Sequence, residues 1–163
     1  MNNADVDLQL TQCRTELDHV QTSITTVGVL SPVAPYLTKY AVIRACGTIE
    51  VSFKALVADF CSNRSNAQVK RFIHMKIRMG SANPSQENIM STLNLFDETW
   101  KKKLKSNLKS DPDKQKLLAS LQSLVDARNE FAHGGSPTLS IADVLQHFDH
   151  ARRIVEHVDT VIA

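Results

Sequence analysis

Apolar residues recur at steps of three and four along most of the chain, which is the spacing of amphipathic helices. The first apolar stripe covers Leu10–Val27, and Gly28 and the Ser31–Pro32 pair interrupt the chain after it. A second stripe predicts a long helix from about Pro35 to Phe60, and a polar run at 62–66 ends it. The chain is therefore expected to begin with two long helices.

Shorter helices are expected in the middle of the chain. Asn83 suits the N-cap of one of them, and Pro84 suits its first helical position. Core spacing then continues to Leu108, with or without a bend, and Trp100 in this series is expected to pack inside rather than to stack on a base. An earlier helix, at about Ala67–Ile77, carries apolar residues on one side: Val69, Phe72, Ile73 and Ile77.

Two further long helices complete the pattern. The first begins at 111–113 (Asp-Pro-Asp), runs to His133 and stops at Gly134-Gly135, because glycine takes the left-handed cap conformation without penalty. Ser140 and Asp143 form a capping box at the start of the second. The pattern predicts an all-α bundle of four long helices, with shorter helices between the second and the third.

Composition agrees with a helical fold and narrows the class of protein. The chain has 163 residues, of which 42% are hydrophobic and 22% charged, so we expect a single domain over residues 1–163. A net charge of +2 is too small for a protein coated with cations or for a disordered polyelectrolyte. No apolar stretch reaches 18 residues and the polar N-terminus is unlike a secretory signal, so we expect a cytoplasmic protein with no membrane partner.

The cysteines and histidines do not predict a metal site. The chain has three cysteines, an odd number, and no C-x-x-C pair. They are therefore expected to be core thiols rather than disulfides or zinc ligands: Cys13, Cys46 and Cys61. We therefore expect no cofactor and no metal. On the last helix, His147 and His150 follow Asp143 by about one turn, but the two histidines lack a third convincing ligand of the kind zinc needs.

An arginine interrupts the apolar stripe of the helix that ends before Gly134. Arg128 stands where the step from Leu124 to Phe131 calls for a core residue. Because an unpaired buried charge is costly, it must pair with an anion or face a wet groove. Asn129 and His133 share a neighbouring polar face, about 100° around the helix axis from the arginine. A long arginine side chain covers much of that separation.

The stretch Arg128-Asn129-Glu130-Phe131-Ala132-His133, which reads R-N-x-x-x-H, resembles the signature of the HEPN superfamily. The segment from Asn83-Pro84-Ser85 to Trp100 is similar to the RiboL-PSP-HEPN branch, and the resemblance covers roughly Tyr40 to Ile162. The resemblance implies a HEPN-type helical bundle. It also implies a metal-independent endoribonuclease, in a toxin or defence context, that acts as a homodimer whose two motifs line one cleft.

The resemblance also implies a role for each motif residue. His133 is the expected general base on the ribose 2′-hydroxyl, Arg128 holds the scissile phosphate and stabilises its charge, and Asn129 orients either group. The products would be a 2′,3′-cyclic phosphate and a 5′-hydroxyl. The chemistry is reasonable by itself, because an imidazole exchanges protons near neutral pH and a guanidinium matches phosphate with paired donors. The expected partners are RNA, a second copy of the chain and an antitoxin or other regulatory protein.

A second interpretation stays open. Some HEPN domains keep the fold as non-catalytic modules, which here would serve dimerisation or the binding of a partner protein, RNA or nucleotide. The two interpretations differ in what they predict for a His133→Ala variant, which abolishes activity in the first and changes nothing in the second.

Glu50 is the expected supporting residue. It lies beside the apolar stripe of the second helix, where an acidic side chain that faces the bundle would anchor Arg128. An ordinary exposed ion pair with Lys54, four residues later, explains Glu50 equally well.

A lysine run offers a surface for RNA. Residues 100–116 contain seven Lys and two Asp, a local charge of +5 that leaves −3 for the rest of the chain. Cationic side chains of this kind bind a nucleic-acid backbone with salt-sensitive affinity, although a solvated helix face is an equal alternative. The expected RNA contacts are Lys101, Lys102, Lys103 and Lys105.

Overall fold

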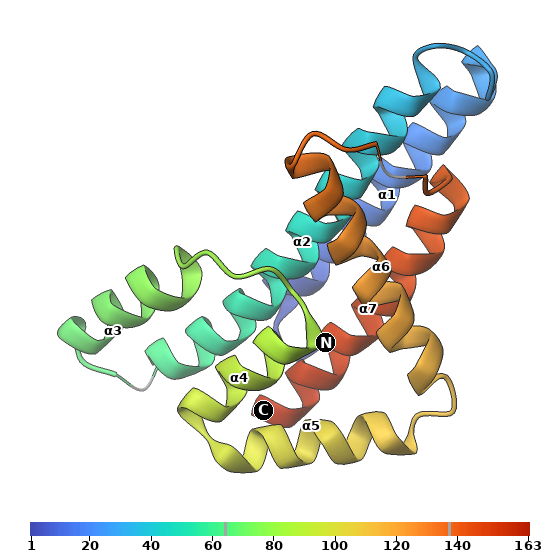
Figure 1. Cartoon of the computed structure of the whole chain (residues 1–163). Coiled ribbons are helices and arrows are strands. Elements are labelled where there is room, and N and C mark those ends of the chain that lie inside the picture. Colours follow the sequence, from blue (N-terminus) through green and yellow to red (C-terminus); the bar gives the residue numbers. More distant parts are fainter. Residues whose placement is uncertain (64, 137) are drawn as a thin grey trace.

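The computed structural model describes residues 1–63, 65–136 and 138–163, and within them it contains helices and no strand. Helices α1 (Ala4–Val27) and α2 (Ala34–Asn63) form a long antiparallel hairpin (Figure 1). Helices α6 (Lys114–Ala132) and α7 (Ile141–Ile162) pack along it, and α7 contacts α1, α2, α5 and α6. The predicted all-α bundle with four long helices is confirmed.

Shorter segments connect α2 to α6, as predicted. Helix α3 (Ala67–Ile73) continues into a π-helical turn, η1 (His74–Arg78), and both project to one side of α2 (Figure 1). Helices α4 (Gln86–Phe96) and α5 (Glu98–Ser110) cover the end of the bundle that holds the two chain termini. The fold therefore has a compact body of long helices and a lateral projection from α2.

Two predictions about the connecting segments need correction. Helix α4 is capped by Ser85 rather than by Asn83, because the Asn83 carboxamide oxygen accepts a hydrogen bond from the Ser85 backbone N–H at 3.3 Å and so closes a turn before the helix. The Ser85 hydroxyl then accepts from the backbone N–H of Asn88 at 3.2 Å. In the short helix before it, Ile73 is buried but Val69 and Phe72 are exposed, so the predicted apolar side is not a core side.

Other local predictions are confirmed. Ser140 and Asp143 form the capping box of α7. A bend separates α4 from α5 at Asp97, whose backbone is extended and whose side chain caps α5. Helix α2 ends within the polar run at 62–66, because its last residue is Asn63, and Arg64 falls outside the described residues.

The core lies where α2, α6 and α7 meet, and α1, α4 and α5 close it. Trp100 is 9% exposed and meets Phe60 edge to face, with ring centroids 5.4 Å apart, so it packs inside as predicted. None of the helices that the structure describes combines the length and the apolar character needed to cross a membrane. The largest fully buried side chains include Leu10, Leu17, Ile49, Phe53, Leu104, Leu117, Leu121 and Phe148.

Candidate functional site

The candidate site lies at the C-terminal end of α6, where the chain leaves the helix through two glycines. The backbone N–H of Gly134 donates to the Phe131 carbonyl at 3.0 Å, and that of Gly135 donates to the Glu130 carbonyl at 2.8 Å. These two bonds form a Schellman motif, which requires a left-handed residue, and Gly134 supplies it with φ of +85°. The glycines therefore hold His133 in place as the C-cap residue of α6.

Arg128 and Asn129 are joined by their side chains. Both are half-buried, and Nη1 of the arginine donates to Oδ1 of the asparagine at 3.2 Å. No carboxylate of the described chain lies within 4.0 Å of the guanidinium. Since a guanidinium carries five N–H donors, most of them remain available to an anion.

His133 is exposed at the end of the helix, five residues after Arg128. Its imidazole makes no hydrogen bond to any residue described in the structure. The three residues of the predicted motif thus occupy the last turn and a half of α6, with a cation, an amide and an accessible imidazole within one helix end. We refer to Arg128, Asn129 and His133 as the motif.

Helix α2 borders the motif along its length. The ammonium of Lys39 lies 5.6 Å from the ring centroid of Phe131 and donates to the Ser136 hydroxyl at 3.1 Å, so it connects α2 to both sides of His133. Lys39 was not predicted as a site residue, because no local pattern in the sequence shows that this part of α2 meets the end of α6. Its ammonium also lies 5.9 Å from the ring centroid of Tyr36, which is 71% exposed on the same helix.

Glu50 pairs with Lys54 and not with Arg128. Lys54 is 5% exposed, and its ammonium contacts both the Glu50 carboxylate and the carbonyl of Gly80. A buried ammonium needs such partners, and its ion pair with Glu50 leaves that carboxylate unavailable to Arg128. The predicted anchoring of Arg128 by Glu50 was therefore wrong, and the i,i+4 pair forms instead, although it is not an exposed pair.

The buried thiol of Cys46 shows that Glu50 and Arg128 nevertheless lie in one neighbourhood. Burial raises the pKa of this thiol to about 12, while the charge of Arg128 lowers it and that of Glu50 raises it. A thiol with such a pKa is inert at neutral pH, which agrees with its prediction as a core residue.

The predicted lysine contacts are not brought to the motif within one protomer. Helix α5 packs against the start of α6, and the 19 residues of α6 place His133 about 28 Å further along the axis (Figure 1). Lys102 pairs with Glu98 at 3.0 Å on an exposed surface. The lysines of this run lie at the far end of the bundle: Lys101, Lys102, Lys103 and Lys105.

His147 and His150 join α7 to α6. Their Nδ1 atoms lie 3.1 and 2.8 Å from the hydroxyl of Ser120, which is buried. Burial lowers the pKa of His147, the neighbouring Asp143 raises it, and His150 lowers it. Within the described ranges no group of three His, Cys, Asp or Glu residues is arranged to hold a metal.

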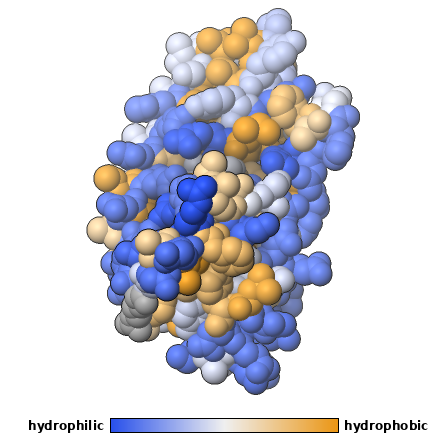
Figure 2. Space-filling model, turned by 90° about the vertical axis from the view of Figure 1, so that its left-hand side faces the viewer, coloured by the Kyte–Doolittle hydropathy of each residue, from blue (hydrophilic) through white to orange (hydrophobic). Residues whose placement is uncertain are grey.

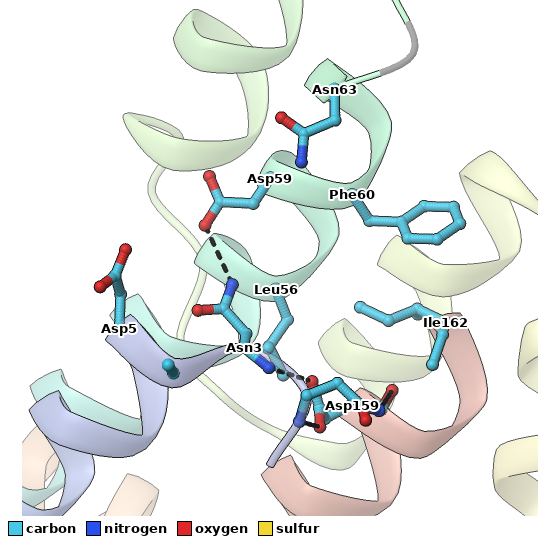
Figure 3. Close-up of a pocket in the computed structure, with 11 residues that line it drawn as sticks. Asn3, Asp5, Leu56, Asp59, Phe60, Asn63, Asp159 and Ile162 are labelled. Atoms are coloured by element: carbon cyan, nitrogen blue, oxygen red, sulfur yellow. Dashed lines mark hydrogen bonds between the residues drawn. The ribbon is translucent and has the colours of Figure 1, made fainter.

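A pocket of about 370 Å³ lies far from the motif, between the N-terminus and the ends of α2 and α7 (Figure 3). Three aspartates line it, and the carboxylate of one, Asp159, accepts hydrogen bonds from the backbone N–H groups of Asn2 and Asn3. An acidic lining disfavours phosphate, so this pocket is not part of a nucleic-acid site.

Comparison with known protein families gives a match over most of the chain. A model of the RiboL-PSP-HEPN family matches residues 9–163, a range that contains the motif and all helices from α2 to α7. The match begins within α1, so the likeness extends further towards the N-terminus than the range from Tyr40 that the sequence suggested. No curated protein and no solved structure matches the chain.

Proposed function

Because the chain belongs to the RiboL-PSP-HEPN family, we propose that it is a metal-independent endoribonuclease with the motif as its active site. The observation that carries this proposal is the pairing, at one helix end, of an exposed imidazole with a guanidinium that no carboxylate of the described chain neutralises. A phosphodiester would supply the missing anion.

In the proposed reaction His133 takes the proton from a ribose 2′-hydroxyl. The 2′-oxygen attacks the adjacent phosphorus, the bond to the 5′-oxygen breaks, and an imidazolium returns a proton to that oxygen. The products are a 2′,3′-cyclic phosphate and a 5′-hydroxyl. Arg128 binds the non-bridging oxygens and stabilises the charge that develops on them. Asn129, whose Oδ1 accepts from Arg128, keeps the guanidinium in place.

A second copy of the chain would complete this site. One protomer supplies a single imidazole, whereas the reaction uses a base and an acid, so a two-fold axis beside the motif would provide both. Helix α2 offers a surface for such a copy, because apolar residues at steps of four, three and eight remain exposed on one side of it. They are Tyr36, Tyr40, Ile43 and Val51.

The proposed setting is that of a toxin or defence ribonuclease in the cytoplasm, held inactive by an antitoxin or another regulatory protein. The motif is intact, and this supports activity. The second candidate is a non-catalytic module for dimerisation or for binding protein, RNA or nucleotide. The observation that favours it is that His133 has no side-chain partner to orient it among the described residues.

A cleavage assay in the presence of a chelator separates the two functions. Single-stranded RNA is incubated with the wild-type protein, His133→Ala and Arg128→Ala, and His19→Ala serves as a control at an exposed histidine of α1. We expect the wild type and the control to cleave equally, and the two motif variants to lose about 100-fold or more. Equal activity in all four proteins, or a requirement for added metal, would contradict the proposal.

A further inference from the structure

The projection formed by α3 and η1, residues 67–78, is a cationic segment that we call the arm. No acidic residue occurs between Asp59 and Glu87 in the chain, whereas the arm carries Lys70, Arg71, Lys76 and Arg78. Its main contacts are with α2, and it extends sideways from the bundle (Figure 1). The arm therefore presents positive charge away from the body of the protein.

Exposed apolar side chains lie among these cations. Phe72 is 62% exposed, and Met75 and Met79 are also exposed. Figure 2 shows the side of the molecule to which the arm projects, where apolar patches alternate with polar ones. The arm is attached to the bundle through Ile73, which is buried, so the aromatic ring of Phe72 is not needed for that attachment.

The cations of the arm are mostly free of carboxylates. Arg78 pairs with Asp59 of α2, but Lys70, Arg71 and Lys76 are exposed and form no ion pair with any residue that the structure describes. Free cations beside an exposed ring suit a nucleic acid, because cations bind phosphates and a ring stacks on an unpaired base.

The arm is anchored to the same helix that borders the motif. The carbonyl of Gly80, two residues after the arm, is held by the ammonium of Lys54, and Lys39, which contacts Phe131 and Ser136 on the two sides of His133, lies fifteen residues earlier on α2. Fifteen residues of helix span about 22 Å, a distance that a short single strand covers. One bound strand can therefore contact the arm and approach the motif along α2.

The lysine run of α5 lacks these features. Its aromatic residue, Trp100, is buried, one of its lysines pairs with Glu98, and it lies at the far end of α6 from His133. A lipid surface is also a poorer match for the arm, since membrane-bound helices separate an apolar side from a charged one. Here Phe72 stands four residues before Lys76, and Arg71 four before Met75, so cations and apolar groups share each side.

We propose that the arm is the surface that binds single-stranded RNA and guides it to the motif, with Lys70, Arg71 and Lys76 on phosphates and Phe72 stacked on an unpaired base. This inference rests on the proposed ribonuclease function, for which it names the substrate-binding surface. Binding and cleavage are separate measurements, so each proposal can fail without the other.

The test measures binding of a fluorescent single-stranded RNA by anisotropy over a series of salt concentrations, in a His133→Ala background that prevents cleavage. The arm variant carries Lys70→Gln, Arg71→Gln and Lys76→Gln. The rival variant removes the same charge from α5 through Lys101→Gln, Lys102→Gln and Lys105→Gln. Circular dichroism checks that both remain folded, and Phe72→Ala tests the stacking contact separately.

Loss of three phosphate contacts should lower the salt slope by about 2 and weaken binding about 50-fold near 0.15 M salt. Phe72→Ala should weaken binding to single strands about tenfold and leave binding to duplex RNA unchanged. The rival α5 variant should lose much less than the arm variant. An equal or greater loss from α5, or an unchanged arm variant, would overturn the inference.

Two further outcomes are informative. If the arm variant binds RNA normally but no longer binds vesicles with anionic lipid, the arm is a membrane surface and the RNA assignment is wrong. If the arm binds RNA as expected but the wild-type protein does not cleave it, the ribonuclease proposal fails while the binding surface stands.

Discussion

The charged groups near the two ends of α6 differ in whether they are paired with opposite charges. At its start the carboxylate of Asp111, whose side chain is 5% exposed, accepts from Arg153 at 2.9 Å and contacts the His157 imidazole at 3.0 Å. At its other end, Arg128 bonds only to Asn129 in the part of the chain that the structure describes, and His133 is exposed.

This difference separates stability from function along one helix. The paired charges at the start hold the turn between α5 and α6 against α7, so they contribute to folding. The guanidinium and imidazole at the far end have no such partners, and the fold therefore gains little from them. Charged groups that make no stabilising contact within the fold are candidates for binding a ligand.

The largest effect is expected from Arg128→Lys, which keeps the charge but loses the planar paired donors. Cleavage should fall about 100-fold while the melting temperature stays within a few degrees of wild type. Single-turnover rates and thermal denaturation on the same preparation measure both. Full activity in this variant would show that only a point charge is needed at this position.

The opposite result is expected from Asp111→Ala at the start of α6. Removing the shared acceptor of Arg153 and His157 should lower the free energy of unfolding by about 1–3 kcal/mol, measured by urea denaturation. Asp126→Ala, which removes an exposed carboxylate of α6, should change it by less than about 0.5 kcal/mol. Equal effects of the two substitutions would remove the distinction between the two ends.

Gly134→Ala should cost about 1–2 kcal/mol, because its φ of +85° strains an L-residue. Cleavage should fall as well, since the Schellman motif that positions His133 is distorted. Gly47→Ala is the matched control. Its added methyl meets nothing within 4 Å inside α2, and it should be neutral or stabilising. A destabilised but fully active Gly134→Ala protein would show that this turn does not position the imidazole.

The smallest effect concerns pH. Burial holds the pKa of His147 below its ordinary value, so the unfolded chain binds more protons than the folded one below about pH 6.5. Stability should therefore fall as pH drops from 7 towards 5, and His147→Gln should make the decline shallower. Urea midpoints across this range measure it, and an unchanged slope in the variant would contradict the assignment.

Local features of the fold were predictable from the sequence because they depend on neighbouring residues. Helical periodicity, the capping box at Ser140 and the glycine stop after His133 involve contacts within a few positions. The motif was found for the same reason, since Arg128, Asn129 and His133 lie on one helix end.

Apart from the N-cap of α4, which lies two residues after the predicted Asn83, the features that the sequence did not reveal involve contacts between distant segments. Glu50 pairs with a lysine that is buried because the loop at Gly80 returns to α2, and no local pattern shows that return. The position of the α5 lysines depends on which end of α6 that helix covers. Phe72 is exposed because the short helix bearing it packs only through Ile73, which periodicity alone does not reveal.

The most direct test of the central claim uses an RNA with a single cleavage site and the same RNA with one 2′-deoxynucleotide on the 5′ side of the scissile phosphate. If His133 activates the 2′-hydroxyl, the first should be cut in chelator to fragments ending in a 2′,3′-cyclic phosphate, and the second should stay intact at that position. Cleavage of the deoxy-substituted bond at an equal rate would contradict the account, because the proposed nucleophile would be absent.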